Sequence, residues 1–206
     1  MRHLAIYGAG GAGRGVMPLL HASALPGDTL WFVDDGEAGQ EINGHRTLGF
    51  ADFAALSGEK RVALAIADAD TRRALADRSE EAQIGFLEVR AASVVEMDDV
   101  RLGEGAILSP FVTLTSNIRI GRHFHANLYS YVEHDCVIGD FVTFAPAVRC
   151  NGNVIIGDGA YIGAGAVIRQ GITIGECATV GMGAVVTKDV PAGETWVGNP
   201  ARKLVR

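Results

Sequence analysis

The second half of the chain repeats itself at a fixed spacing, and this limits the possible folds more than any other feature. Five pairs of an aliphatic residue and a glycine recur every 18 residues, from Leu102-Gly103 to Ile174-Gly175. Each interval divides into three sixes, and all fifteen residues at the first position of a six, from Leu102 to Val186, are apolar. Four places later fourteen of the fifteen are apolar, and Ser130 is the exception.

A period of six matches neither an α-helix, which repeats every 3.6 residues, nor an uninterrupted alternating strand, which repeats every two. It predicts a solenoid with three short strands and three corners in each coil, the architecture of the hexapeptide β-helices. The first residue of each six points inward and stacks on its equivalent 18 residues later, while glycine and other small residues fit the tight corners. The register is unbroken from Leu102 to Pro191, so we expect no long loop inserted into the coils.

The first ninety residues follow a different pattern, in which apolar strands alternate with helices. Such alternation predicts a parallel α/β sheet. The expected strands are 2–7, 29–35, 61–68 and 84–89, and the expected helices are 14–23, 51–58 and 69–82. We therefore predict a Rossmann-like α/β domain over residues 1–92, followed by a β-helix domain with a C-terminal tail over residues 93–206.

Charge and cysteine content narrow the functional classes. The 206 residues carry a net charge of −6, which disfavours a general nucleic-acid binder because such proteins need clustered Lys and Arg. The N-terminus lacks the apolar core of a signal peptide, and no run approaches the ~20 apolar residues of a membrane span. Cys136, Cys150 and Cys177 have no zinc-site spacing, so we expect reduced thiols in a cytoplasmic protein.

A glycine-rich segment follows the first predicted strand. Gly8, Gly10 and Gly13 satisfy G-x-G-x-x-G, and Asp34 ends the second strand. Such a loop lets a phosphate approach backbone N–H groups at a helix start, and the carboxylate can accept hydrogen bonds from a ribose or a base. A domain of this size favours a sugar nucleotide over a nicotinamide dinucleotide. The alternative is a tight strand–helix turn whose glycines serve packing alone.

His134 occupies the third position of its six, which is a corner of the predicted coil. Its equivalents 18 residues away are Ser116 and Gly152, and Glu133 and Asp135 flank it. A general base needs an imidazole with a pKa near the working pH and a partner that orients it, and both are available here. The alternatives are an exposed turn histidine with solvated acids, or a zinc site that joins His134 to two further histidines, His123 and His125.

Several stretches together resemble the NeuD/PglD-type bacterial sugar acetyltransferases of the hexapeptide-repeat class. The resemblance covers the whole chain and rests on the glycine loop, FVDD at 32–35, NLYSYVEHDCVIGDF at 127–141, RCNGNVIIGDGAYIGAGAVI at 149–168 and VGNPARKL at 197–204. It implies a left-handed parallel β-helix and a homotrimer with active sites between neighbouring subunits. It also implies transfer of an acetyl group from acetyl-CoA to an amino group, or less often a hydroxyl, of a nucleotide-activated or free sugar.

The resemblance also implies roles for individual residues. His134 is the base, and Asp135 holds its imidazole; spacing alone does not choose between Asp135 and Glu133. The positions implied for the sugar substrate are Gly8, Gly10, Gly11, Ala12, Asp34, Asp35, Ala67 and Asn127. Those for the CoA arm are Thr143, Ala164 and Met182, with Gly152 beside the base.

The glycine loop and the basic tail qualify this picture. At Gly10 and Ala12 the loop lacks the serine and histidine that are common in the family. Lys188, Arg202, Lys203 and Arg206 give the tail a positive balance, which suits the anionic phosphates of CoA.

We predict a direct acetyl transfer to a nucleotide-linked amino sugar, without a resident metal. Three alternatives remain: a sugar O-acetyltransferase of the sialic-acid type, a zinc enzyme of the γ-carbonic anhydrase kind, and a non-catalytic, ligand-binding trimeric scaffold.

Overall fold

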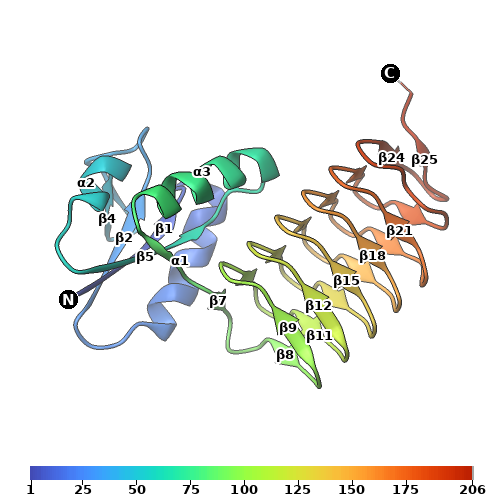
Figure 1. The fold of residues 1–206 in the computed structure, drawn as a ribbon, viewed down its shortest axis with the longest axis horizontal. Helices are drawn as coiled ribbons and strands as arrows, with labels where there is room; N and C mark the ends of the chain where they lie inside the picture. Colours follow the sequence, from blue (N-terminus) through green and yellow to red (C-terminus); the bar gives the residue numbers. More distant parts are fainter. Residues whose placement is uncertain (206) are drawn as a thin grey trace. The chain divides into compact units, whose positions relative to one another are not determined.

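The structure is a computed structural model that describes residues 1–205, and it divides into two compact units, Met1–Val89 and Arg90–Arg206 (Figure 1). The division falls close to the boundary predicted between residues 92 and 93. Each unit has its own regular hydrogen-bonded sheets. None of the helices in the described residues is long and apolar enough to cross a membrane.

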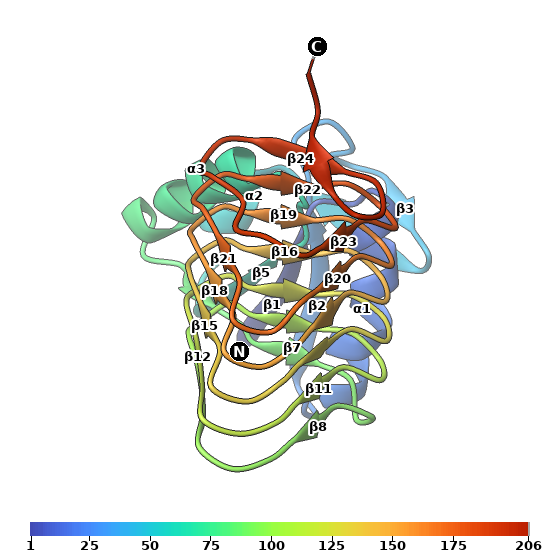
Figure 2. The same ribbon diagram turned by 90° about the vertical axis from the view of Figure 1, so that its right-hand side faces the viewer.

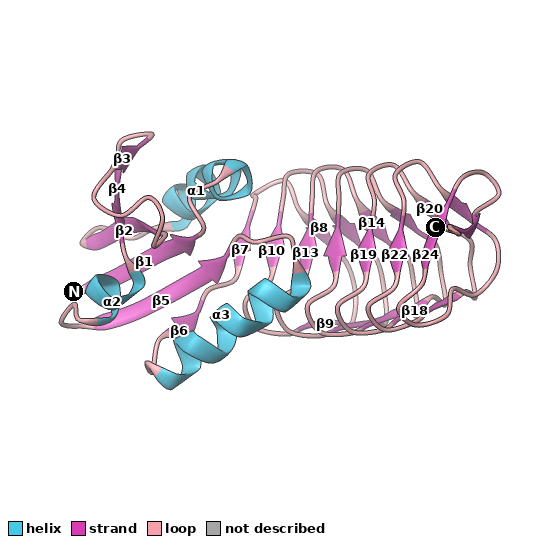
Figure 3. Ribbon diagram, turned by 90° about the horizontal axis from the view of Figure 1, so that it is seen from above, coloured by secondary structure: helices cyan, strands magenta, loops and turns pink. Residues whose placement is uncertain are grey.

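The N-terminal unit contains a six-stranded sheet in the order β3-β4-β2-β1-β5-β6. Its strands are β1 (Arg2–Tyr7), β2 (Asp28–Val33), β3 (Glu41–Ile42), β4 (His45–Leu48), β5 (Glu59–Leu64) and β6 (Gly85–Phe86). All neighbours pair in parallel except β3 and β4. Helix α1 (Gly11–Ser23) covers one face of the sheet, and α2 (Phe50–Ala54) and α3 (Ala69–Glu81) lie on the other (Figure 3).

Two features of this unit differ from the expectation. Helix α1 begins at Gly11 rather than after the glycine segment, so half of that segment is helical. A short hairpin, β3–β4, forms one edge of the sheet and was not predicted. Its turn is Asn43-Gly44, with φ of 49° and 79°, and Asn-Gly is the dipeptide that favours a two-residue hairpin turn. The signal was therefore present in the sequence.

The C-terminal unit is a parallel β-helix of three sheets, seen nearly along its axis in Figure 2. Sheet 1 contains β7 (Val89–Arg90), β10 (Ile107–Leu108), β13 (His125–Ala126), β16 (Thr143–Phe144), β19 (Tyr161–Ile162), β22 (Thr179–Val180), β24 (Thr195–Val197) and β25 (Arg202–Lys203). Sheet 2 contains β8 (Val95–Glu96), β11 (Thr113–Leu114), β14 (Tyr131–Val132), β17 (Arg149–Cys150), β20 (Val167–Ile168) and β23 (Val185–Val186). Sheet 3 contains β9 (Val100–Leu102), β12 (Ile118–Ile120), β15 (Val137–Ile138), β18 (Ile155–Ile156) and β21 (Thr173–Ile174).

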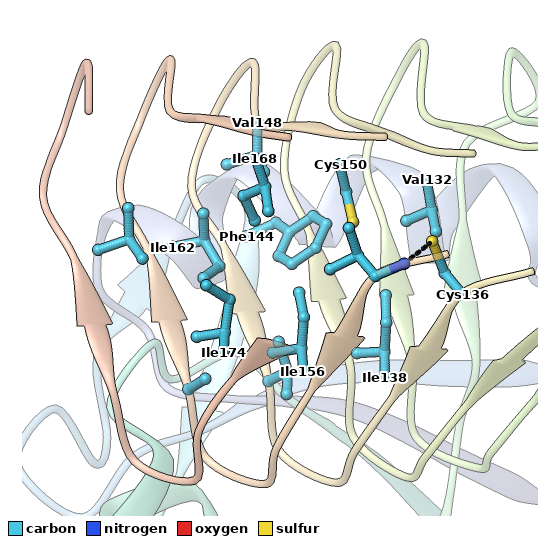
Figure 4. Close-up of a cluster of buried hydrophobic side chains, with 14 of the residues drawn as sticks. Val132, Cys136, Ile138, Phe144, Val148, Cys150, Ile156, Ile162, Ile168 and Ile174 are labelled. Atoms are coloured by element: carbon cyan, nitrogen blue, oxygen red, sulfur yellow. Dashed lines mark hydrogen bonds between the residues drawn. The ribbon is translucent and has the colours of Figure 1, made fainter. Parts of the chain in front are cut away.

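The predicted register is confirmed by the strand pairing. Residues 18 apart are partners, as in Ile138 with Ile156 and Cys150 with Ile168. The first-position side chains from Leu108 to Val186 form a continuous buried stack, and Figure 4 shows part of it. Ser130, the polar exception, is buried as well. Burial of this apolar column stabilises the coil, because the hydrophobic effect scales with the apolar area removed from water.

The repeated glycines occupy tight corners where a side chain would clash, as expected. A Cβ at Gly157 would lie 2.5 Å from the backbone nitrogen of Glu176 in the next coil, and one at Gly103 would lie 2.5 Å from Gly121. These glycines therefore permit close stacking of coils. The left-handed corner conformation is adopted by other glycines, such as Gly159 and Gly165, and also by residues with side chains, among them Asp135 and Asn153.

Candidate active site

His134 and Asp135 lie at the corner that joins sheet 2 to sheet 3, which we call the second corner of their coil. Asp135 has a φ of 60°, and this left-handed turn places its carboxylate beside the preceding side chain. Backbone hydrogen bonds hold the corner between its neighbours in the stack: Asp135 N donates to Ser116 O at 3.0 Å, and Asn153 N donates to His134 O at 2.9 Å. The position of the imidazole is therefore set by three successive coils.

The imidazole is paired through one nitrogen and exposed at the other. His134 Nδ1 lies 2.8 Å from Asp135 Oδ2, and Asn117 Nδ2 donates to Asp135 Oδ1 at 3.1 Å. No hydrogen bond joins Glu133 to the ring anywhere in residues 1–205, so its influence is limited to its charge. The geometry thus selects Asp135 as the partner of the imidazole, a choice that spacing alone left open.

The electrostatics of the pair favour a charged imidazole next to a charged carboxylate. The hydrogen bond with Asp135, together with the charges of Asp135 and Glu133, raises the pKa of His134 above its usual value. The hydrogen bonds from His134 and Asn117 lower the pKa of Asp135. Asp135 holds a proton on Nδ1, and Nε2 is therefore the nitrogen that presents a lone pair. An exposed Nε2 of raised basicity can accept a proton from a bound nucleophile.

Gly152 occupies the position of His134 in the next coil, and because it has no side chain, the imidazole ring has room there. A Cβ at residue 152 would lie 2.6 Å from His134 Cε1 and 2.7 Å from Nε2. Gly152 does not have a positive φ, so its backbone conformation does not require glycine. The absence of a side chain is explained by the imidazole itself.

The glycine segment of the N-terminal unit contains two glycines that packing requires. Gly8 has a φ of 104°, and a Cβ there would lie 2.6 Å from the Ile66 side chain. A Cβ at Gly13 would overlap the carbonyl of Gly8, so helix α1 could not approach β1 as closely. These two positions match the alternative that the glycines serve a tight strand–helix turn.

Gly10 and Gly11 are different because no atom lies within 4 Å of a Cβ built at either position. Both are exposed. Gly10 is the N-cap of α1, it has a negative φ, and no side chain caps the helix or places an acid in its first turn. Packing and backbone strain therefore do not explain these glycines. The uncapped amides at an open helix start can bind an anionic group.

The two carboxylates after β2 are already bonded within the chain. Asp34 accepts hydrogen bonds from Ala9 N at 2.9 Å and from Gly36 N at 3.0 Å, which fastens the glycine loop to the end of β2. Asp35 accepts from Phe50 N at 2.7 Å and from Arg78 at 2.7 Å. Each oxygen retains a lone pair for a ligand, but both side chains have a structural role at the carboxyl edge of the sheet.

Comparison with known proteins identifies the family. Residues 3–79 match the PglD N-terminal domain, and residues 153–188 match the bacterial transferase hexapeptide (six repeats). The chain is 45% identical over 211 residues to GDP-perosamine N-acetyltransferase of Escherichia coli O157:H7, covering 98% of this chain and 96% of that protein.

The chain belongs to the NeuD/PglD-type family of sugar acetyltransferases. It is an acyltransferase, as its relatives are. WeeI from Acinetobacter baumannii AYE has the same fold, with a TM-score of 0.97 and 49% identity over 99% of this chain and all of that chain. PerB from Caulobacter crescentus, solved in complex with CoA and GDP-perosamine, has a TM-score of 0.91 and 30% identity over 98% of this chain and 97% of that chain. These neighbours confirm the predicted Rossmann-like domain and left-handed β-helix.

In this acetyltransferase most of the predicted site residues of the β-helix lie at two different edges of sheet 2. Asn127, Ala164 and Met182 are exposed at the corner between sheets 1 and 2, which we call the first corner. His134 and Gly152 are at the second corner, as is the exposed Lys188. Sheet 2 separates the two corners, so one protomer does not bring these two sets together.

The remaining predicted positions vary in exposure. Thr143 lies in β16 of sheet 1 and is only 6% exposed, so it offers little surface to a ligand. Ala12 is exposed in the first turn of α1, and Ala67 lies in the loop that follows β5. In the tail, Lys203 pairs with Glu194 at 2.6 Å. Arg206 lies outside the described residues.

The three histidines considered for zinc do not converge. His123 is buried and stacks on Phe141 with ring centroids 5.0 Å apart, whereas His125 belongs to sheet 1 and His134 to the second corner. Within residues 1–205 no group of three or more His, Cys, Asp or Glu has the arrangement of a metal site.

Arg78 is a residue of the carboxyl edge that sequence reasoning missed. Its guanidinium donates to Asp35 and, at 2.8 Å, to the Tyr7 hydroxyl, and it lies 4.1 Å above the Phe50 ring. No sequence pattern distinguishes Arg78, because it is one of several arginines on a polar helix. The position of Asn117, in contrast, follows from the register, since it stands 18 residues before Asp135 in the same column.

Proposed function

We propose that this acetyltransferase transfers the acetyl group of acetyl-CoA to the amine of a sugar linked to GDP, with His134 as the general base. The observation that carries the proposal is the exposed imidazole of His134, paired with Asp135 and seated over Gly152. The E. coli relative named a GDP-perosamine N-acetyltransferase, and the PerB complex with CoA and GDP-perosamine, support the choice of GDP and of an amino group.

The geometry supports a direct transfer. His134 Nε2 removes a proton from the sugar amine as its nitrogen attacks the thioester carbonyl, an N–C bond forms, and the C–S bond breaks. The proton then passes to the CoA thiolate, and His134 returns to its neutral state. Asp135 keeps the ring in the tautomer with a free Nε2 and stabilises the imidazolium that forms. This sequence needs neither a covalent acyl-enzyme nor a metal ion.

The nucleotide part of the substrate fits the open start of helix α1. A diphosphate would approach the amides at Gly10 and Gly11, where no side chain intervenes. The favourable interaction of an anion with a helix N-terminus would compensate for the missing serine and histidine of the family loop. Asp34 and Asp35 would contribute their remaining lone pairs to the ribose or the base, and Ala67 would line the neighbouring loop.

We further propose that the functional assembly is a homotrimer. The CoA residues at the first corner, Ala164 and Met182, and the base at the second corner lie on opposite edges of sheet 2. If sheet 2 faces a threefold axis, the first corner of one protomer meets the second corner of the next, and three equivalent sites close the ring. Outward side chains of sheet 2 include Val167 and Val185, which suit a partly apolar interface.

The cysteine chemistry agrees with action in the cytoplasm. Cys136, Cys150 and Cys177 are all free, as expected in a reducing compartment.

Replacing the base tests the proposal directly. We expect His134→Ala to lower kcat by about 10² to 10⁴ while leaving the melting temperature within a few degrees, since the side chain is exposed. The assay is thiol release from acetyl-CoA with GDP-, UDP- and dTDP-linked amino sugars. His21→Ala, which alters an exposed residue of helix α1, is the matched control and should retain full activity.

The outcomes separate the alternatives. Full activity in His134→Ala would remove this residue as the base, and turnover with another nucleotide alone would reject GDP. A hydroxylamine-labile product would indicate ester formation and hence O-acetylation. Absence of any turnover in the unmodified protein, with ligand binding retained, would favour the non-catalytic scaffold.

A further inference from the structure

The proposed reaction does not use Cys136, yet this residue lies directly behind the proposed base. Cys136 follows Asp135 in the chain and occupies the inward position of the second corner. Its side chain is fully buried, with 0% exposure. It is therefore unsuited to act as a nucleophile on an external substrate, and its effect on the reaction has to pass through its neighbours.

The thiol of Cys136 contacts the backbone of two successive corners. Sγ lies 3.2 Å from Asn151 O and 3.7 Å from His134 O, and it accepts a hydrogen bond from Val154 N at 3.4 Å (Figure 4). A single S–H donates to one carbonyl at a time, and the shorter distance favours Asn151. The sulfur thus links the corner that carries His134 to the corner of the next coil.

Apolar residues fill this inward position in the other coils. The equivalents of Cys136 are Ile118, Val154, Ile172 and Val190. Their side chains can only pack, because they carry no polar atom. A hydrogen-bonding group at this column is therefore a feature of the coil that contains His134, and packing alone does not require it.

Ser130 provides a second example in the same coil. Its Oγ donates to Ala145 O and accepts from Val148 N, both at 3.1 Å. In other coils the amide at this first-corner position bonds directly to the carbonyl three residues earlier, as in Ala166 N to Gly163 O at 3.1 Å. The Ser130 hydroxyl therefore hydrogen-bonds to the turn of the next coil, as the Cys136 thiol does at the second corner.

The two bonds of Cys136 enclose the peptide segment on which the imidazole rests. Asn151 and Val154 stand on either side of Gly152, and the His134 ring lies within 2.6 Å of the place where a residue 152 Cβ would be. We propose that Cys136 is a positioning residue for acetyl transfer, whose buried thiol fixes the 151–154 corner beneath His134 and so holds the ring against Asp135. This proposal depends on the proposed role of His134.

The expected consequence is a change in the reactivity of His134 rather than in substrate binding. If the thiol is lost, the 151–154 corner can shift, and the ring no longer keeps its geometry with Asp135. Small misplacements of a catalytic group lower kcat about tenfold to a hundredfold. The groups whose charge acts on the ring are Asp135, Glu133 and Cys136 itself, and the hydrogen bond with Asp135 has the largest influence. A weaker contact with Asp135 should therefore return the pKa of His134 toward its usual value.

The test compares Cys136→Ala and Cys136→Ser with Ile172→Val as the control. Ile172→Val also removes one buried heavy atom at the same inward column, but it does so away from the His134 corner. We expect Cys136→Ala to lower kcat about tenfold or more with the KM for acetyl-CoA little changed. The pKa of His134, followed by NMR of protein labelled at the histidine Cε1 position and assigned with His134→Gln, should fall. Cys136→Ser should restore part of both quantities, because its hydroxyl can donate and accept.

The control should lose a similar amount of thermal stability while keeping the wild-type kcat and the wild-type pKa of His134. Wild-type kcat and pKa in Cys136→Ala would overturn the proposal, as would equal changes in Ile172→Val. If Cys136→Ala does not fold, Cys136→Val decides, because valine fills the same inward position in other coils and cannot hydrogen-bond. Wild-type kcat and a wild-type pKa of His134 in Cys136→Val would also reject the proposal. Because the NMR titration is independent of turnover, a failure of His134 as the base remains distinguishable from a failure of Cys136 as its positioning residue.

Discussion

Gly152 in the β-helix and Gly10 in the N-terminal unit both lack a backbone reason to be glycine, but their surroundings are opposite. The space above Gly152 is filled by the chain itself, because the His134 ring lies where a side chain would stand. The space above Gly10 is empty within 4 Å. Gly152 makes room for the side chain that we propose as the base, and Gly10 leaves open space at the start of helix α1.

In the proposed mechanism, the β-helix supplies the base and the N-terminal unit binds the nucleotide. The second corner is built before any substrate arrives, with His134 held by Asp135, Asp135 held by Asn117, and the ring supported from the next coil. Such preorganisation lowers the cost of the chemical step. The start of helix α1 instead offers unfilled backbone amides, which suits a site whose polar partners come with the ligand.

Among the variants that keep His134, the largest effect on this contrast is expected when Asp135 loses its charge. In Asp135→Asn the amide can donate to Nδ1, which would place the ring proton on Nε2 and remove the lone pair that accepts the substrate proton. We expect kcat to fall by up to about 10³-fold.

The pH profile supplies a second readout of the same variant. The pKa of His134 is raised mainly by Asp135, and a base works only when it is unprotonated. Activity of the wild type should therefore fall as the pH drops below this raised pKa, and the acid limb of kcat/KM should move to lower pH in Asp135→Asn. If the acid limb of kcat/KM in Asp135→Asn stays at the wild-type pH, a group other than His134 controls that limb.

A smaller effect is expected when a side chain is added under the ring. Gly152→Ala places a Cβ within contact distance of His134 Cε1 and Nε2, so the imidazole has to move. We expect a decrease in kcat of about 10²-fold with a modest loss of stability. Activity equal to the wild type would mean that the ring is free to adopt another productive position, and the contrast with Gly10 would disappear.

The smallest effect is expected at the open glycine. Gly10→Ala should leave kcat and the melting temperature nearly unchanged and should raise the KM for the nucleotide sugar about tenfold, as expected when binding alone is weakened. Gly13→Ala is the informative partner, because its Cβ would overlap the Gly8 carbonyl and should destabilise the N-terminal unit. An unchanged KM in Gly10→Ala would contradict a ligand at this position.

Sequence reasoning succeeded where a residue's role follows from a period. The six-residue register predicted the inward stack, and the offset of 18 placed Ser116 and Gly152 beside His134. It failed where roles depend on side-chain direction. Spacing did not choose between Glu133 and Asp135, since a corner interrupts the alternation of a strand. It also noted Ser130 only as the exception in an apolar column, and it counted Cys136 among the apolar members of that column.

The amino-acid sequence by itself determined the two-part architecture, the inward column of the coils and the corner that bears His134. These features are periodic or local, and a stack of equivalent coils converts spacing along the chain directly into neighbourhood in space. Only the tertiary structure decided that Asp135 pairs with the ring, that Arg78 reaches Asp35 across the sheet, and that two of the loop glycines are packed while two are open. Those facts depend on backbone dihedral angles and on contacts between segments whose separation along the chain follows no period. A sequence repeat therefore does not encode them.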